Sequence, residues 1–346
     1  MINGIINVYK EKGYTSHDVV ARLRGILKQK KIGHTGTLDP DAVGVLPVCL
    51  GKGTRLCDML TDETKTYVAG LLLGSETDTQ DTSGTILKEG DTSALTEEQV
   101  RDVIASFVGE QMQVPPMYSA LKVNGKKLYE LAREGKEVER KARPVTFYEI
   151  NILEMNLPHV KMEVTCSKGT YIRTLCHDIG QKLGCGGCME SLVRTKVGRF
   201  EISESLTLKE IEELRDKELY EKKLWDSGVC NQKLQNEELK RKTPESNQTE
   251  YLTRTDDSDM FSFVHTVESM FSHLTAVKVP ERMDKALYNG NAVRYHRDLL
   301  DNEEVRMYTS RGEFIGIFRY EQEKKLFHIV KMFYEHVKTG KIPKNM

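Results

Sequence analysis

The segment at 33–47 constrains this chain most, because it displays one carboxylate, Asp39, in a frame of glycine, threonine and proline. It begins Gly-His-Thr-Gly-Thr-Leu-Asp-Pro and ends Gly-Val-Leu-Pro. Pro40 fixes its own φ and restricts Asp39 to extended conformations, so we expect a stiff loop. A stiff loop can hold a nucleophile or base in near-attack geometry. Taken alone, the loop is more typical of a turn or a helix cap than of a catalytic site.

Basic residues surround this loop in the sequence and suggest a polyanionic substrate. No acidic residue occurs at 19–38, and the basic residues there are Arg22, Arg24, Lys28, Lys30, Lys31 and His34. A second basic segment at 115–144 carries eight Lys or Arg between 121 and 143 against four Glu, with Tyr118 and Tyr129 among them. Basic residues with interleaved aromatics suit phosphate contact and base stacking. A solvated helix surface can produce the same pattern.

Length and composition limit the class of protein. The 346 residues correspond to about two domains. With 38% hydrophobic and 30% charged residues, the chain fits a soluble globular protein, and its net charge of −1 confines any nucleic-acid signal to local patches. The sequence has no recognisable secretory signal and no apolar stretch near the ~20 residues that span a bilayer. We therefore expect a cytoplasmic protein without membrane association.

The seven cysteines point to free thiols in a reducing compartment, because their number is odd and no signal peptide is visible. Cys185 and Cys188 form a Cys-x-x-Cys pair with Cys176 and His177 upstream, a pattern shared with zinc and redox sites. The pair has no second Cys-x-x-Cys in the sequence. We expect a glycine turn after a helix here, and neither a metal nor a cofactor.

Hydrophobic periodicity outlines the elements. We predict a helix capped by Ser16, a strand at 66–73, a helix capped by Thr96, strands at 145–153 and 160–166, a helix at 171–183 ending at Gly184, and a helix opened by Thr207. Short strands at 306–308, 314–320 and 326–333 predict a small β-rich domain. The polar segment at 226–262 lacks periodicity and is predicted to be a flexible linker.

Four blocks of the sequence, in this order, resemble the bacterial TruB-type tRNA pseudouridine-55 synthases. They are 33–47, the run Lys-Thr-Tyr-Val-Ala at 65–69, the run Pro-Pro-Met-Tyr-Ser-Ala-Leu-Lys at 115–122 with Gly125, and the run Cys-Ser-Lys-Gly-Thr-Tyr-Ile-Arg-Thr-Leu at 166–175. Four matches in one order are far more specific than the loop alone. The resemblance runs to about residue 200, and the C-terminal part resembles a PUA RNA-binding domain.

The resemblance implies an α+β fold. Its core would be a mixed, mainly antiparallel sheet with flanking helices and a basic thumb insertion, joined to a small β-rich PUA-like domain. It divides the chain into a catalytic domain at 1–225 with the thumb at about 115–144, a polar linker at 226–262, and a PUA-like RNA-binding domain at 263–346.

The resemblance also implies an isomerase that converts uridine 55 in the tRNA T loop to pseudouridine. Asp39 would be the catalytic aspartate, Tyr67 would stack on the target base and help to remove its C5 proton, and Arg173 would pair with Asp39. Arg173 would also offset the pKa rise that burial imposes on the carboxyl group, and a bidentate pair would orient it. Substrate contacts are implied for His34, Leu192, Lys10, Lys122, Tyr171 and Arg194. The implied partner is the T stem-loop of tRNA, bound by a monomer without cofactor, metal or protein partner.

The sequence departs from the family pattern directly after two of these residues, Lys10 and Leu192. Glu11 follows Lys10 where the family tends to have proline, and Val193 stands where one of two arginines is common after Leu192. Two other functions stay open: a non-catalytic RNA-binding or tRNA-folding protein, and a guide-RNA-dependent pseudouridine synthase. The chemical route is open as well, since an ionised Asp39 could attack C1′ or remove a sugar proton.

Overall fold

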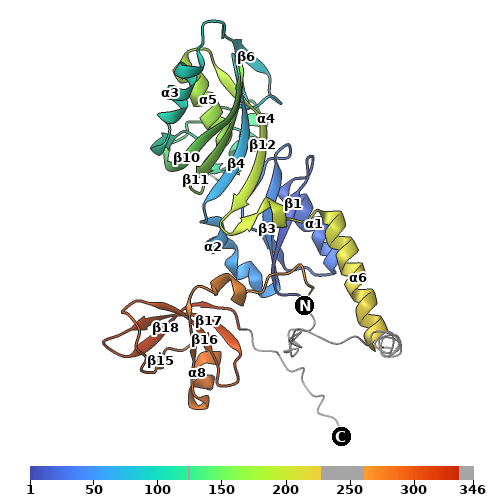
Figure 1. Ribbon diagram of the computed structural model, residues 1–346, viewed down its shortest axis with the longest axis vertical. Coiled ribbons are helices and arrows are strands. Elements are labelled where there is room, and N and C mark those ends of the chain that lie inside the picture. The colour runs from blue at the N-terminus through green and yellow to red at the C-terminus, as the bar shows by residue number, and fades with distance from the viewer. Residues whose placement is uncertain (124, 227–260, 335–346) are drawn as a thin grey trace, which may run out of the picture.

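The computed structural model describes residues 1–123, 125–226 and 261–334, so nearly all of the predicted linker lies outside the described residues. Within them, the larger sheet has nine strands (Figure 1). These are β1 (Gly4–Lys10), β2 (Ile32–His34), β3 (Val43–Leu50), β4 (Lys65–Leu73), β7 (Gly109–Gln113), β10 (Arg143–Asn156), β11 (His159–Cys166), β12 (Gly187–Val197) and β13 (Phe200–Glu201). Around it lie α1 (Ser16–Leu27), η1 (Gly51–Leu56), α2 (Cys57–Thr61), α3 (Glu97–Ala105), α5 (Ile172–Leu183), η2 (Ile202–Glu204) and α6 (Leu208–Asp226).

The sheet runs in the order β1-β3-β12-β4-β11-β10-β7, with β2 added to β3 and β13 to β12. Its pairings are antiparallel except that of β12 with β3. Helices α3 and α5 cover the same face (Figure 1), where alternate residues of β4 such as Ala69 and Leu71 pack against Leu175 and Ile179 of α5. The predicted α+β fold with a mainly antiparallel sheet is confirmed.

Two smaller hairpins project from this core. One consists of β5 (Ser75–Thr77) and β6 (Ile86–Glu89), and the other consists of β8 (Lys122–Val123) and β9 (Lys126–Lys127). The second hairpin leads into α4 (Leu128–Arg133), and together they form the basic excursion seen in the sequence.

Helix α1 begins differently from the prediction. Thr15, not Ser16, is the N-cap: its backbone is extended, its hydroxyl accepts the Asp18 N–H at 3.1 Å, and the Asp18 carboxylate accepts the Thr15 N–H at 2.8 Å. This reciprocal pair satisfies two donors that a helix start leaves open, so it outcompetes a lone serine cap. Ser16 is instead the first helical residue and is buried. The caps predicted at Thr96 and Gly184 are confirmed.

The C-terminal domain is built on a five-stranded sheet in the order β14-β16-β17-β18-β15. Its elements are η3 (Glu268–Phe271), β14 (Thr275–Lys278), η4 (Glu281–Met283), α8 (Asp284–Tyr288), β15 (Val293–Arg294), β16 (Glu304–Tyr308), β17 (Phe314–Glu321) and β18 (Leu326–Met332). The expected β-rich domain is thus present. Its PUA-like character and the predicted domain limits stay predictions.

One apolar cluster joins the two domains. Phe200 and Leu56 of the larger domain share it with Phe271 and Phe333 of the smaller one. Backbone bonds extend the junction, since Ile5 exchanges N–H···O bonds of 2.9 and 2.8 Å with residue 265. The small domain therefore packs on the larger domain through a shared core.

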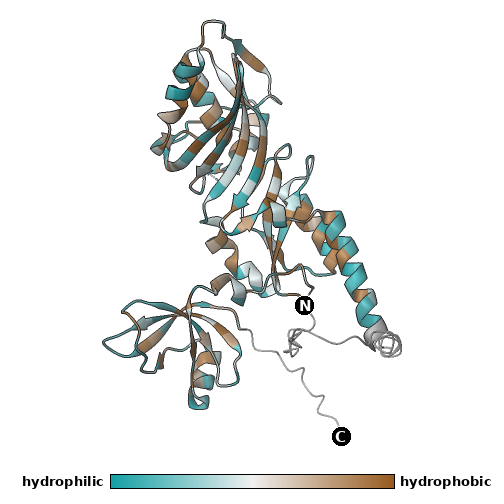
Figure 2. Cartoon of the chain, viewed as in Figure 1, coloured by the Kyte–Doolittle hydropathy of each residue, from teal (hydrophilic) through white to brown (hydrophobic). Residues whose placement is uncertain are grey.

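Helix α6 leaves this core toward the solvent. Its first turns bury Leu208 and Ile211 against the cluster under α1, whereas the rest of the helix is mostly hydrophilic (Figure 2). Among the described residues, no helix combines the length and hydrophobicity needed to cross a bilayer.

Replacing Phe271 by Ala should show that the shared cluster stabilises both domains. The change empties a buried site next to Phe314 and Phe333, and we expect the free energy of unfolding to fall by about 3–5 kcal/mol in urea titrations. Ser272→Ala, at the exposed neighbouring position, should change it by less than about 0.5 kcal/mol. Equal stability of the Phe271 variant and the parent would contradict the shared core.

Candidate active site

The loop at 35–42 presents Asp39 between β2 and β3. The Asp39 carbonyl accepts the Ala42 N–H at 3.1 Å, which closes a β-turn with Pro40 at its second position, where proline is favoured. At the start of the loop, the Thr61 hydroxyl donates to the Thr35 carbonyl at 3.0 Å. The predicted turn and the displayed carboxylate are therefore properties of the same loop.

Arg173 meets Asp39 from the first turn of α5. Its Nε lies 3.1 Å from Asp39 Oδ2, and Nη1 lies 3.6 Å from Asp81 Oδ2. Nη1 also donates to the Thr79 carbonyl at 3.1 Å, and Nη2 to the Tyr118 carbonyl at 2.8 Å. The expected Asp39–Arg173 contact is present, but only one nitrogen of the guanidinium, Nε, makes it. The rest of the guanidinium binds two other segments, so the pair is not the bidentate one expected.

The pKa of the Asp39 carboxyl is raised by burial, and Arg173 offsets only part of this rise. Asp81 adds to the rise by repulsion and Lys10 opposes it. The Asp39 side chain keeps 42% of its surface exposed, against 6% for Arg173, so water screens these effects. Arg173 thus opposes the effect of burial on this pKa, but the net shift is still upward.

Tyr67 and Arg194 lie opposite each other on β4 and β12 and are both buried. Arg194 Nε donates to the Val45 carbonyl at 2.7 Å. Burial raises the pKa of Tyr67, whereas the Arg194 charge lowers it. Leu192, two residues before Arg194, packs against the same core as Tyr67 and Leu38. The sheet thus brings Tyr67, Leu192 and the residue preceding Asp39 together.

Lys10 and Arg194 are placed differently from the expectation of substrate contact. Lys10 is fully buried, and its Nζ donates to the carbonyls of Glu11, Tyr14 and Pro40 at 3.2, 2.7 and 3.1 Å. Burial lowers the pKa of Lys10 to about 8, against the pull of Asp39. Arg194 is only 1% exposed. Both side chains are buried and bind backbone carbonyls of the protein, so their geometry supports the loop and the sheet rather than RNA contact.

The other expected substrate residues are more accessible. Lys122 is exposed on the thumb hairpin, and Tyr171 is half-buried just before α5, where Gln113 binds its N–H at 2.8 Å and its carbonyl at 3.0 Å. His34 is half-buried, with its ring edge-on to His17 at 5.4 Å. Burial lowers the pKa of His34, which favours the neutral ring.

Asp81 is a site residue that the sequence reasoning missed. Its Oδ1 accepts the hydroxyls of Thr79 and Ser83 at 2.7 and 2.5 Å, so it organises the polar turn after β5. Its Oδ2 points to Arg173. The run Thr-Asp-Thr-Gln-Asp-Thr-Ser-Gly at 77–84 signalled a turn, but nothing local signalled a partner 92 positions later.

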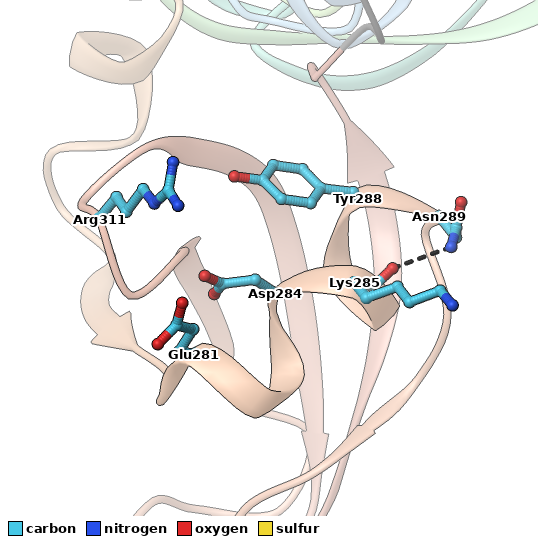
Figure 3. A pocket seen from close by; sticks show the side chains of 6 residues that line it. All are labelled: Glu281, Asp284, Lys285, Tyr288, Asn289 and Arg311. Atoms are coloured by element: carbon cyan, nitrogen blue, oxygen red, sulfur yellow. Dashed lines mark hydrogen bonds between the residues drawn. The ribbon is translucent and has the colours of Figure 1, made fainter.

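A pocket of about 490 Å³ lies well away from these residues, in the C-terminal domain (Figure 3). It is lined by Glu281, Asp284, Lys285, Tyr288, Asn289 and Arg311. Asp284 is held there by the N–H and hydroxyl of Ser310 at 2.8 and 2.6 Å. None of the predicted site residues lines this pocket, so it is separate from the site around Asp39.

The Cys-x-x-Cys pair lies inside the larger domain. Cys185 and Cys188 are both buried, and the Cys185 thiol contacts the Gly186 carbonyl at 3.2 Å in the turn after α5. In the part of the chain that the structure describes, no group of three or more His, Cys, Asp or Glu is arranged to hold a metal.

The two charges beside Asp39 should move its pKa in opposite directions. Arg173→Gln removes the favourable charge and should raise the Asp39 pKa further, whereas Asp81→Asn removes repulsion and should lower it. Carboxyl-carbon NMR of aspartate-labelled protein would follow the titration, with Asp39→Asn used to assign the signal. Shifts of the same sign in both variants would contradict the electrostatic account. Arg173→Lys, which keeps the charge, should lie nearest to the parent.

Comparison with known proteins agrees with this geometry. Residues 24–172 match the family described as "TruB family pseudouridylate synthase (N terminal domain)", and 173–230 match "tRNA pseudouridylate synthase B C-terminal domain". The chain is 45% identical to tRNA pseudouridine synthase B of Lachnoclostridium phytofermentans, over 96% of this chain and all of that protein. It is 42% identical to the protein of the same name from Clostridium tetani, over 96% and 99%.

A solved Cbf5-Nop10-Gar1 complex contains a chain with a similar fold. The TM-score is 0.63 at 27% identity, over 96% of this chain and 85% of the other. The two pseudouridine synthases named above are more similar in sequence to this chain than the chain of that complex is. Their alignments cover almost the full length of both sequences. Because two segments match the family models and these relatives align over nearly their full length, the chain belongs to the TruB family of pseudouridylate synthases.

Proposed function

We propose that this chain isomerises uridine 55 in the T loop of tRNA to pseudouridine, with Asp39 as the catalytic residue. The observation that carries the proposal is the half-exposed Asp39 carboxylate held against the buried Arg173 guanidinium, beside the face that bears Tyr67 and Leu192. The curated relatives are named for tRNA pseudouridine synthesis, which supports tRNA as the substrate. A cytoplasmic monomer that works without a protein partner completes the proposal.

The reaction exchanges one glycosidic bond for another. The N1–C1′ bond of the uridine breaks, the uracil turns, C5 bonds to C1′, and the C5 proton is lost while N1 gains one. An ionised Asp39 either attacks C1′ or removes a sugar proton to start an elimination. Each route requires the carboxylate form, so the raised pKa of Asp39 places the acid limb of the rate profile above the pH expected of a free aspartate.

Tyr67 and Leu192 suit an apolar platform for the uracil. The target base must leave the RNA stack, which costs a few kcal/mol. Stacking on an aromatic ring returns about 1–3 kcal/mol. Tyr67 is proposed as the stacking ring. A part for Tyr67 in removing the C5 proton requires its ionised form, which the charge of Arg194 favours and burial opposes by raising the pKa of the phenol.

The thumb provides the proposed grip on the tRNA backbone. Lys122 is exposed on its hairpin, while Leu128 and Leu131 of α4 are buried beneath it. Tyr129 stacks with Lys127 and Arg133, with the charges 5.2 and 5.4 Å from the ring centre. An exposed positive surface over an apolar base suits phosphate contact. The PUA-like domain is proposed as a second RNA-binding surface.

The guide-RNA-dependent alternative is kept because of the likeness to the Cbf5 chain. It predicts no conversion of bare tRNA by the purified chain. The RNA-binding alternative predicts tRNA binding without conversion even when guide RNA and partner proteins are supplied. Mass-spectrometric mapping of pseudouridine in an unmodified tRNA transcript separates all three.

Asp39→Asn should abolish conversion at the T-loop uridine while tRNA affinity stays within about tenfold, because phosphate contacts dominate binding. Product is mapped by mass spectrometry and affinity by filter binding. Asp41→Asn is the matched control, since that exposed neighbour pairs only loosely with Lys12, at 3.9 Å. Product formation by purified Asp39→Asn would overturn the role of Asp39.

Lys122→Ala should weaken tRNA binding and reduce the slope of log affinity against log salt by about 1, as expected for one lost phosphate contact. The rate constant at saturating tRNA should stay close to that of the parent. Lys161→Ala is the control, because Lys161 is exposed on the sheet face opposite the buried Met162. An unchanged salt slope for Lys122→Ala would remove Lys122 from the RNA interface.

A further inference from the structure

Ser16 has a hydroxyl that helix capping does not use. Thr15 caps α1, and the Ser16 Oγ turns instead to the loop 22 residues later. There it accepts the Leu38 N–H at 3.0 Å and lies 3.5 Å from the Leu38 carbonyl, to which it donates. We propose that Ser16 is a positioning residue for Asp39, acting through the backbone of Leu38.

Burial makes this contact more than incidental. Ser16 is 1% exposed and Leu38 is 3% exposed. Buried backbone groups need hydrogen-bond partners, and one hydroxyl provides a partner to both polar groups of Leu38. The Leu38 side chain at the same time packs in the core with Tyr67 and Ala42. The residue before Asp39 is therefore fixed by its backbone on one side and by its side chain on the other.

The other supports of the loop act farther from Asp39 or are shared. Thr61 holds the Thr35 carbonyl, four residues before Asp39. Lys10 holds the Pro40 carbonyl, which also accepts the Gly13 N–H at 2.9 Å. Among the contacts of the described residues, Ser16 engages both the N–H and the carbonyl of the residue next to the carboxylate.

Loss of the Ser16 hydroxyl should affect the chemical step rather than RNA binding. Asp39 works only when its carboxylate stands in near-attack geometry, and a misplacement of about 1 Å can cost about 100-fold in rate. The affinity for tRNA comes from phosphate contacts elsewhere and should not depend on this hydroxyl. A purely structural role would instead lower stability and leave the rate per folded molecule unchanged.

The test measures single-turnover pseudouridine formation with enzyme in excess over a tRNA transcript. Ser16→Ala should lower the rate constant at saturating enzyme about 10- to 100-fold, with the dissociation constant within about twofold of the parent. Thr15→Ala is the matched control: it removes the cap of the same helix, one residue earlier, without touching Leu38. It should lower the melting temperature but keep the rate constant within about twofold.

The outcomes separate this inference from the proposed function on which it rests. A parent protein that makes no pseudouridine contradicts the proposed function. A productive parent with a Ser16→Ala rate constant equal to its own, or with equal losses in Ser16→Ala and Thr15→Ala, overturns the role of Ser16. If Ser16→Ala does not bind tRNA stoichiometrically, Ser16→Cys replaces it, because a thiol is a weaker donor and acceptor of similar size. Its rate constant should then fall with binding intact, and an unchanged one overturns the inference.

Discussion

The site depends on one buried cation, the guanidinium of Arg173. A buried charge is tolerated only when it is paired and hydrogen-bonded, and Arg173 meets this condition with groups from three separate segments. It contacts the Asp39 loop, Asp81 with Thr79 in the turn after β5, and the Tyr118 carbonyl at the base of the thumb. A single side chain therefore connects the carboxylate, the turn and the basic insertion at 115–144.

The same arrangement limits how acidic Asp39 can be. Burial raises the pKa of Asp39, Arg173 opposes this rise only in part, and Asp81, which contacts the same guanidinium, adds to it by repulsion. The loop is held by contacts to its backbone from Ser16, Lys10 and Thr61, which leave the carboxylate partly open to a substrate. A catalytic group needs a backbone that is held rigidly and a side chain that the substrate can reach.

The C-terminal domain is fixed to this core by apolar packing. Phe271 and Phe333 enter the cluster that holds Leu56 and Phe200, and Arg55 donates to the Met332 carbonyl at 2.8 Å. Residues 51–61 of η1 and α2 lie between this junction and the Asp39 loop, since Thr61 binds Thr35. The small domain is thereby connected to the element that supports the Asp39 loop.

Much of the fold could be predicted from the sequence because it is encoded locally. Alternating apolar residues indicated β4, the Thr96 capping box and Gly184 marked helix ends, and the Asp-Pro turn indicated the position of Asp39. The family resemblance supplied the pairing of Asp39 with Arg173, which no local pattern contains. Capping at Ser16 was predicted wrongly because two neighbouring residues could both cap, and Asp18 decided in favour of Thr15.

What the sequence by itself determined is therefore the helices and strands with clear periodicity or caps, and the one displayed carboxylate. Only the tertiary structure decided that Asp81 shares Arg173, that Lys10 is buried under the loop, and that Ser16 binds Leu38. These partners lie 92, 30 and 22 positions apart in the chain. Propensity and periodicity act over a few residues, whereas the partner of a buried polar group is chosen by which segments the packed core brings together.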